Sequence, residues 1–227
     1  MIRLNNYLEQ LSRHQISDLS EFIVSENFTH HGGQVSANEF RKDVKTIYKE
    51  EVKYFDNSKI YVAKDYIGSI IGSIRVLQWN FIDLLPIQKI FGINPLLAMK
   101  NLEYNEIYHI GRFAIKKDVR DISLLKKLMV CAIAPVCQHE GNVAFAECDS
   151  KLLRILNLMG IYATVLGESV DYLGSETIPI AMSYDGLIDF YNKNKNLVSE
   201  EELVEDHSSN IHKSVVFDYY QHYYSFV

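Results

Sequence analysis

Proline, tryptophan and cysteine are scarce in this chain, which has 4, 1 and 3 of them among 227 residues. The cysteines, Cys131, Cys137 and Cys148, are odd in number and lack metal-ligand spacing. A disulfide framework and a structural zinc site are therefore not expected. Free thiols in apolar segments suit a reducing, cytoplasmic setting, and we expect no metal cofactor.

Long hydrophobic runs and an excess of positive charge are also missing. No apolar run approaches the ~18 residues of a membrane-spanning helix, and the first 15 residues lack the apolar stretch of a signal peptide. The net charge is −6 and the pI about 5.8, whereas nucleic-acid binding needs a basic surface. We therefore expect neither a transmembrane segment nor a nucleic-acid partner.

What is present is the composition of a globular domain, with 48% hydrophobic and 12% aromatic residues. Residue spacing predicts helices over 16–28, 36–55, 122–138, 149–159 and 184–191, and strands over 59–63, 68–77, 107–115, 142–146, 161–165 and 177–183. Pro86, Gly92 and Pro95 divide the apolar passage 79–102 into short helical pieces. This order predicts an α/β (α+β) fold with a mixed sheet.

The segment 107–126 has the strongest functional pattern. Gly111 interrupts a strand, which suggests a bulge or a close backbone approach by a ligand, and Arg112 beside it needs a partner or a polar cavity. A basic turn follows and leads into a helix, whose first amides favour an anion. The segment is either a pyrophosphate seat or an ordinary strand, turn and helix with solvated lysines.

Residues 109–113, HIGRF, resemble the pattern E-x-[SG]-R-[FL] of a fourth strand in the GNAT superfamily, within its N-acyl amino acid synthases and acyl-homoserine-lactone synthases. Residues 72–77, GSIRVL, are similar to the arginine motif of the third strand, and Leu85-Pro86 with Phe91 to the connection that follows. The resemblance spans roughly residues 16–190. It implies a GNAT-like, mostly antiparallel sheet flanked by helices.

The resemblance also implies an acyl donor, either coenzyme A or the phosphopantetheine of an acyl carrier protein, held where the fourth strand splays. The donor-binding residues would be Gly111, Phe113, Ala114, Ile115, Lys117, Arg120, Asp121, Ile122, Ser123 and Leu124. Two departures stand out. The family glutamate falls at His109, and residues 121–124 lack the glycines that many members place in the pyrophosphate turn.

Three residues are candidates for proton transfer. His109 is the first candidate, because an unperturbed imidazole suits removal of a proton from an amine near neutral pH, but a lone strand histidine is also a common structural residue. Glu106 is a reserve base acting through water, or a solvated strand end. Tyr162 would protonate the leaving thiolate, as a tyrosine near this place does in some family members, or would pack in the core with a hydrogen-bonded hydroxyl.

Three more residues are candidates for substrate binding. Arg75 and Arg112 would hold the carboxylate of an amino-acid acceptor, because guanidinium matches carboxylate in two-point geometry. The alternative is a structural salt bridge to Asp56, Glu147 or Asp149. Cys148 would carry a covalent acyl group, although no neighbouring histidine activates it and an inert thiol is favoured.

These residues predict an N-acyltransferase domain over 1–191, with an extension over 192–227 that docks on the domain or on a second copy in a homodimer. The partners would be acyl-CoA or acyl carrier protein and a small amine acceptor. A long acyl chain would lie along Phe81, Leu84, Leu85, Ile87, Ile90, Phe91, Ile93, Leu96, Leu97 and Met99, or these residues would simply cap the sheet. A short-chain acetyltransferase and a non-catalytic acyl-binding module are the alternatives.

Overall fold

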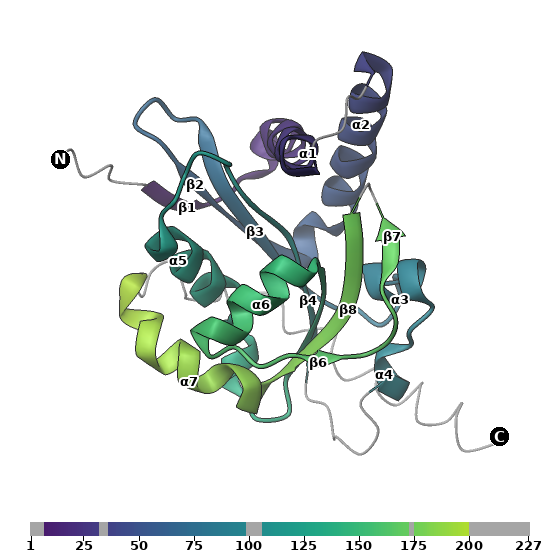
Figure 1. The fold of residues 1–227 in the computed structure, drawn as a ribbon, viewed down its shortest axis with the longest axis vertical. Helices are drawn as coiled ribbons and strands as arrows, with labels where there is room; N and C mark the ends of the chain where they lie inside the picture. Colours follow the sequence, from purple (N-terminus) through teal and green to yellow (C-terminus); the bar gives the residue numbers. More distant parts are fainter. Residues whose placement is uncertain (1–6, 32–35, 99–105, 173–174, 200–227) are drawn as a thin grey trace.

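The computed structural model describes residues 7–31, 36–98, 106–172 and 175–199, and within them an eight-stranded mixed sheet runs through the molecule (Figure 1). Its strand order is β1-β2-β3-β4-β5-β8-β6, and β7 also pairs with β8. All pairs are antiparallel except β4 with β5, which are parallel. The predicted α/β fold with a mostly antiparallel sheet is confirmed.

The strands are β1 (Tyr7–Gln10), β2 (Ser58–Lys64), β3 (Ile70–Gln78), β4 (Ile107–Ile115), β5 (Val143–Cys148), β6 (Thr164–Val165), β7 (Val170–Tyr172) and β8 (Ser175–Ser183). The helices are α1 (Ile16–His31), α2 (Ala37–Tyr54), α3 (Pro86–Phe91), α4 (Pro95–Ala98), α5 (Ile122–Ile133), α6 (Ser150–Met159) and α7 (Tyr184–Asn194). Short 3-10 turns cover Arg13–Gln15, Phe55–Asn57, Val136–Gln138 and Lys195–Leu197.

Local chemistry explains where the helices begin and end. At the start of α2, the Ser36 hydroxyl accepts the Glu39 amide at 3.3 Å, and the Glu39 carboxylate accepts the Ser36 amide at 3.1 Å. Gly160 ends α6 in the left-handed conformation, with φ 83°. Helix α5 ends at Ile133, two residues before Pro135, so the predicted helix over 122–138 divides there as expected.

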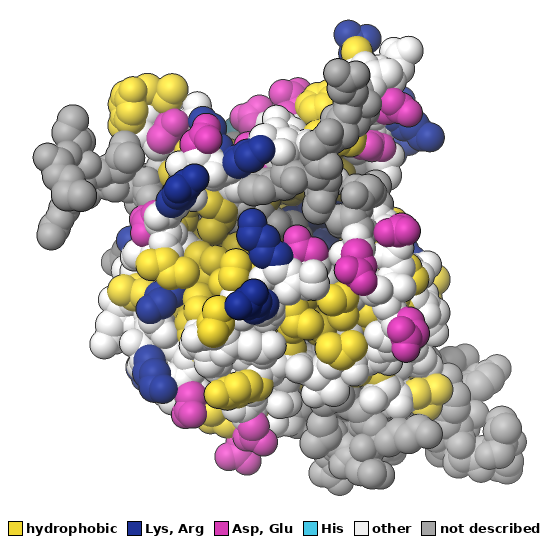
Figure 2. All heavy atoms as spheres, in the orientation of Figure 1, with side chains coloured by type: hydrophobic (Ala, Val, Ile, Leu, Met, Phe, Trp, Pro, Cys, Tyr) yellow, Lys and Arg dark blue, Asp and Glu magenta, His cyan; other side chains and the backbone are white. Residues whose placement is uncertain are grey.

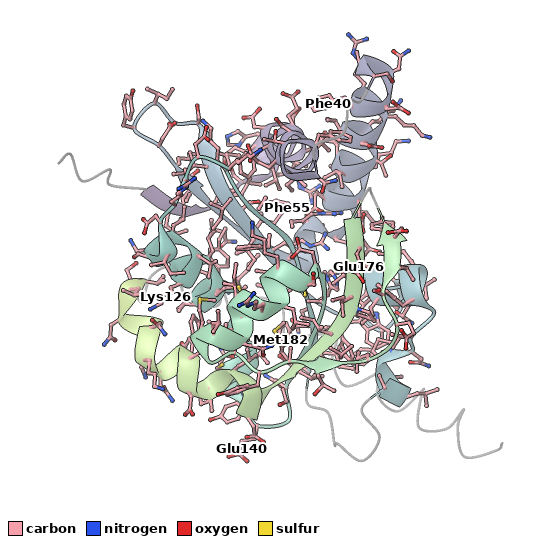
Figure 3. The ribbon with its side chains drawn as sticks, viewed as in Figure 1. Phe40, Phe55, Lys126, Glu140, Glu176 and Met182 are labelled. Atoms are coloured by element: carbon pink, nitrogen blue, oxygen red, sulfur yellow. The ribbon has the colours of Figure 1, made fainter. Side chains whose placement is uncertain are left out.

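The two larger apolar clusters of the described residues pack against the central strands. The larger one joins β2–β5 and β8 to α5, α6 and α7, and includes Leu128, Met182 and Phe190; Met182, labelled in Figure 3, lies on β8. The second joins the segment 79–98 to the sheet through Leu77, Ile87 and Phe145. Leu77 and Phe145 lie opposite His109 in the sheet register, so His109 faces the second cluster.

Several details differ from the sequence-based expectations. Strands β1 and β7 were not expected, residues 161–163 form a loop, and α1 runs to His31, past its predicted end at residue 28. Helix α7 runs to Asn194, past its predicted end at residue 191, and Val198 beyond it is buried in the larger cluster. Met99 and residues 200–227 of the expected extension lie outside the described residues.

Two further findings concern the described residues as a whole. None of their helices has the length and apolar character needed to cross a membrane. None of their His, Cys, Asp and Glu side chains form a group of three or more that suits a metal ion.

On the face shown in Figure 2, lysine and arginine side chains are scattered among hydrophobic ones over α5 and α6, with no single basic patch.

Candidate active site

Strands β4 and β5 pair along only part of their length. The parallel register begins at Ile107 with Val143 and ends at Ile110 with Ala146, while β4 continues to Ile115 and β5 to Cys148. Burial changes at the same point: residues 107–110 are buried and residues 111–115 half-buried. The strands therefore part next to Gly111, as the resemblance implied.

A bulge in β4 lies beside this parting. Ser73 pairs with Ala114 and Arg75 with Gly111, so β4 carries one more residue than β3 across this interval. Arg112 takes the strain of the bulge, with φ 55°. The buried Ser73 hydroxyl donates to the Arg112 carbonyl at 2.8 Å, which satisfies the backbone there. The bulge predicted from Gly111 is present, and Arg112 is its left-handed residue.

His109, Gly111, Arg75 and Glu147 share one face of the sheet. Gly111 is two residues beyond His109 on β4, Arg75 pairs with Gly111, and Glu147 is two residues beyond Phe145, which pairs with His109. His109 is 1% exposed, and both of its ring nitrogens are in contact with charged groups. Its Nε2 lies 2.9 Å from Glu147 Oε2 and its Nδ1 lies 3.4 Å from Arg75 Nη2.

Both candidate arginines pair with glutamates of helix α2. Arg75 Nη1 donates to Glu51 Oε1 at 2.7 Å, and Arg112 Nε donates to the same oxygen at 2.6 Å. Arg112 Nη2 also donates to Glu50 Oε2 at 2.7 Å. The structural salt-bridge interpretation is therefore the one observed, but its predicted partners were wrong.

The three predicted partners are used elsewhere. Asp56 pairs with Arg13 on the surface, Glu147 contacts His109, and the Asp149 side chain caps α6 by accepting the Leu152 amide at 2.6 Å.

Because this cluster is buried, the pKa of each of its charged groups depends strongly on the neighbouring charges. Glu51 and Arg75 have side chains 0% and 1% exposed. Burial alone would raise the pKa of Glu51, but the adjacent Arg75 and Arg112 outweigh it and hold that pKa below its ordinary value. The same balance lowers the pKa of Glu50, where burial is opposed mainly by Arg112. Burial opposes the charge of Arg112, and Glu51 and Glu50 reverse this and raise its pKa.

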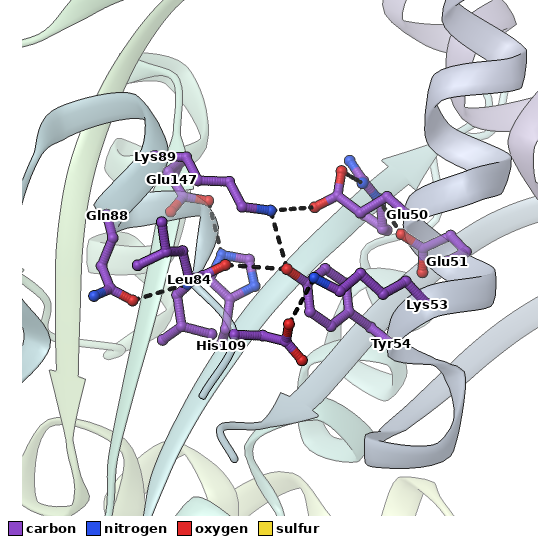
Figure 4. A network of polar contacts seen from close by, with 12 residues as sticks. Glu50, Glu51, Lys53, Tyr54, Leu84, Gln88, Lys89, His109 and Glu147 are labelled. Atoms are coloured by element: carbon purple, nitrogen blue, oxygen red, sulfur yellow. Dashed lines mark hydrogen bonds and ion pairs between the residues drawn. The ribbon is translucent and has the colours of Figure 1, made fainter. Parts of the chain in front are cut away.

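The cluster continues outward through Tyr54 and Lys89, as Figure 4 shows. Lys89 Nζ donates to the Tyr54 hydroxyl at 3.0 Å and lies 3.9 Å from Glu50 Oε1. The Tyr54 hydroxyl donates to the Leu84 carbonyl at 3.0 Å. Tyr172 on β7 is 43% exposed, and its pKa is raised first by partial burial and then by Glu50. Its hydroxyl therefore stays protonated near neutral pH.

The turn expected to bind pyrophosphate has two amides occupied by the protein's own carboxylates. The Lys117 amide donates to Glu26 Oε2 at 2.9 Å, and the Ser123 amide donates to the N-cap residue Asp121 at 2.8 Å. Lys117 Nζ donates to the Thr29 carbonyl at 3.2 Å. A donor phosphate at the start of α5 would therefore compete with these two carboxylates.

The remaining predicted residues are not part of the cluster. Tyr162 is 65% exposed, so the expectation that it packs in the core was wrong. Glu106, at the start of β4, accepts from Gln78 Nε2 at 3.0 Å and from the Tyr108 hydroxyl. Cys148 is buried, and its pKa is raised to about 12 first by burial and then by Asp149 and Glu147. A thiol held neutral in this way is a poor nucleophile, which supports the inert interpretation.

The segment 79–98 is divided between core and surface. Leu85 and Ile87 are 1% and 0% exposed and belong to the second apolar cluster, while Ile82, Leu84 and Leu97 are 75%, 56% and 61% exposed. Part of this segment therefore caps the sheet, as one of the two interpretations held.

Sequence reasoning missed Glu50 and Glu51 and gave Glu147 the wrong partner. The two adjacent glutamates lie on a helix rich in charge, where a solvated face was the ordinary expectation. A usable signal was present in the arginines themselves, because two charged residues inside buried strands require two acids from another element.

A mixed sheet with a bulged β4 that parts from β5 is the architecture of the GNAT acyltransferase fold, and the comparisons show this fold. No protein-family model and no curated protein matches the sequence. Solved structures do match. FeeM, an N-acyl amino acid synthase from uncultured soil microbes, is 12% identical with a TM-score of 0.56, over 85% of this chain and 98% of FeeM.

Two other structures have the same fold. BjaI, a CoA-dependent acyl-homoserine lactone synthase solved with SAM and isopentyl-CoA, is 15% identical with a TM-score of 0.51, over 84% of this chain and 90% of BjaI. A GNAT-family acetyltransferase from Staphylococcus aureus Mu50 is 14% identical with a TM-score of 0.50, over 78% and 98%.

Proposed function

We propose that this protein is an N-acyltransferase that moves an acyl group from acyl-CoA or acyl carrier protein to the amine of an amino acid or a similar small acceptor. The observation that carries the proposal is the end of β4–β5 pairing at Ile110 and Ala146, beside a buried charge cluster in a GNAT fold. The proposal includes a cytoplasmic location, where acyl-CoA and acyl carrier protein are both present.

The thioester arm lies along residues 111–115 of β4, where β5 no longer pairs. Backbone N–H groups there stabilise the oxyanion of the tetrahedral intermediate, commonly the largest catalytic contribution. The pairing of Arg75 and Arg112 with glutamates leaves them less suited to hold an acceptor carboxylate than the sequence suggested. The amine is therefore the part of the acceptor that the site recognises best.

The test is a transfer assay with purified protein. Acyl-CoA and acyl-carrier-protein donors from two to sixteen carbons are incubated with a panel of amino acids and simple amines, and amide products are measured by mass spectrometry. We expect amide formation above the rate without protein. If no donor and acceptor pair exceeds that background, the proposed function is rejected.

The packing of segment 79–98 against the sheet favours a second candidate, a short-chain acetyltransferase. Leu85 and Ile87 already pack against the sheet, and an acyl chain displacing them would lose that burial. Thermal shift separates the candidates, because each buried methylene is worth about 0.8 kcal/mol. Equal stabilisation by acetyl-CoA and a ten-carbon acyl-CoA favours the short-chain enzyme.

The occupied turn favours a third candidate, a non-catalytic acyl-binding module. With Glu26 and Asp121 on its amides, this turn is a poor seat for a pyrophosphate. Donor binding by calorimetry together with background-level transfer to every amine would support this candidate over the enzyme.

A further inference from the structure

We infer that Glu147 removes the proton from the acceptor amine and that His109 is the residue that positions it. The inference rests on the proposed acyltransfer. It names a base that the sequence pattern did not indicate, since Glu147 was expected only as a salt-bridge partner.

Glu147 lies where the two strands have just parted, one residue beyond Ala146, the last β5 residue that pairs with β4. Its side chain is 11% exposed, and its Oε2 is held by His109 Nε2 at 2.9 Å. Its Oε1 is buried with no hydrogen-bond partner among the described residues. A buried carboxylate oxygen without a donor is costly, so an amine or one bridging water at this position would be favoured.

The contacts of His109 fix one form of the ring. Arg75 is a donor only, so His109 Nδ1 accepts from it at 3.4 Å. The Glu147 carboxylate is an acceptor only, so His109 Nε2 carries the proton and donates it at 2.9 Å. In this neutral form neither nitrogen has a lone pair for a substrate. His109 therefore orients Glu147 and does not act as the base.

The other acidic side chains near the point where β4 and β5 part already have partners. Glu50 and Glu51 are paired with arginines, which hold their pKa values low. Asp149 caps helix α6, and Glu106 lies at the opposite end of β4 and accepts from Gln78. Among the ion pairs of the described residues, Glu147 has no lysine or arginine partner. Its carboxylate is therefore not tied to a fixed lysine or arginine there.

The acceptor arrives as an ammonium ion, and Glu147 takes one proton from it, directly or through one water. The free amine attacks the thioester carbonyl carbon, so a C–N bond forms and the carbonyl electrons move onto oxygen. When the intermediate collapses, the C–S bond breaks and its electron pair leaves on sulfur. The second nitrogen proton passes to the thiolate, and the Glu147 proton returns to water.

The test compares Glu147→Gln with Glu176→Gln, a matched change on the neighbouring strand β8, where Glu176 is exposed and accepts from Ser169 (Figure 3). At pH 7.5 we expect Glu147→Gln to lose roughly 100-fold or more in kcat with an alkylamine, the usual range for general-base catalysis. Hydroxylamine is largely unprotonated at this pH, so its acylation should fall far less. Glu176→Gln should match wild type with both acceptors.

The outcomes separate the two proposals. If wild type transfers the acyl group to the alkylamine and Glu147→Gln does so equally well, the role of Glu147 is overturned, and the proposed function is not. An equal loss with both acceptors also overturns it, since a base is not needed for hydroxylamine. No transfer by wild type overturns the proposed function and this inference with it.

A second measurement does not depend on activity. Nitrogen NMR of the His109 ring should show a protonated Nε2 and an unprotonated Nδ1 in the wild-type protein at pH 7.5. His109→Gln, which can still donate to Glu147, should retain more alkylamine transfer than His109→Ala and a pH profile closer to wild type. A ring protonated on Nδ1, or equal activity of the two variants, contradicts the positioning role.

Discussion

A β-carbon placed on Gly111 would lie 2.9 Å from Cε1 of His109 and 3.4 Å from its Nδ1. Real β-carbons essentially never approach a neighbour so closely, and this ring is held at both nitrogens by Arg75 and Glu147. The glycine is thus required by the side chain two residues before it on the same strand face. This explains Gly111 without any ligand, which the sequence had offered as a reason for a glycine in this strand.

Gly111→Ala should therefore disturb His109 without altering any charged group. We expect a loss of about 1–3 kcal/mol in the free energy of unfolding, the usual cost of overpacking a core. Gly167→Ala is the control, because its nearest neighbour would be Ile93 at 3.8 Å, an ordinary contact. Urea denaturation measures both. Equal stability of the two variants would show that the His109 ring moves aside freely.

Glu51→Gln should be strongly destabilising, because it removes the charge that Arg75 and Arg112 share in the interior. Breaking a buried pair typically costs about 3–5 kcal/mol, because it leaves a buried charge uncompensated. Here that charge is Arg75, whose ion pair is with Glu51, whereas Arg112 keeps its pair with Glu50. Asp56→Asn removes the acid of a surface pair whose side chains are 82% and 53% exposed, and should change stability little. Similar small effects of both changes would mean that water reaches the cluster.

The free energy of unfolding should also decrease as the pH falls into the acid range. The folded-state pKa values of Glu50 and Glu51 lie below the ordinary value of 4.5, so the unfolded chain binds their protons first. Their contribution is fully present above about pH 4.5 and is lost as the pH falls through the folded values. The stability gap between wild type and Glu51→Gln should therefore shrink between pH 6 and pH 3. A gap independent of pH would contradict the lowered pKa of Glu51.

Much of the fold was predictable because its signals are local. The strand 107–115 has the predicted bounds, and helix α6 ends at Met159, where the residue spacing placed its end. Strand β1 was missed because YLEQ has little strand character of its own and is held by pairing with β2. Its hydrogen bonds come from a partner about fifty residues away, and local spacing carries no record of them.

The site was predictable only in part, for a similar reason. Gly111, Arg112 and the bulge followed from one segment of sequence. The acids that complete the site, Glu51 and Glu147, come from a helix and from the neighbouring strand, so only the tertiary structure brings them to Arg75 and His109.

The turn after β4 gives a last prediction, because two carboxylates occupy amides that a donor phosphate would use. Glu26 accepts from the Lys117 amide and Asp121 from the Ser123 amide. A negative charge some 5 Å from a phosphate costs roughly 0.8 kcal/mol in a water-like dielectric, about fourfold in affinity. Asp121→Asn and Glu26→Gln should each tighten CoA binding by about this factor, because asparagine and glutamine keep the hydrogen bond and lose the charge.

Isothermal titration calorimetry with CoA measures this effect, and Asp149→Asn is the matched control. Asp149 caps α6 as Asp121 caps α5, so its substitution makes the same chemical change at a different helix start. Asp149→Asn should leave CoA affinity unchanged. If Asp121→Asn binds CoA more tightly than wild type but binds pantetheine, which has no phosphate, with unchanged affinity, the effect lies at the phosphates. Weaker CoA binding by Asp121→Asn and Glu26→Gln would instead show that the two carboxylates hold the turn in its binding shape.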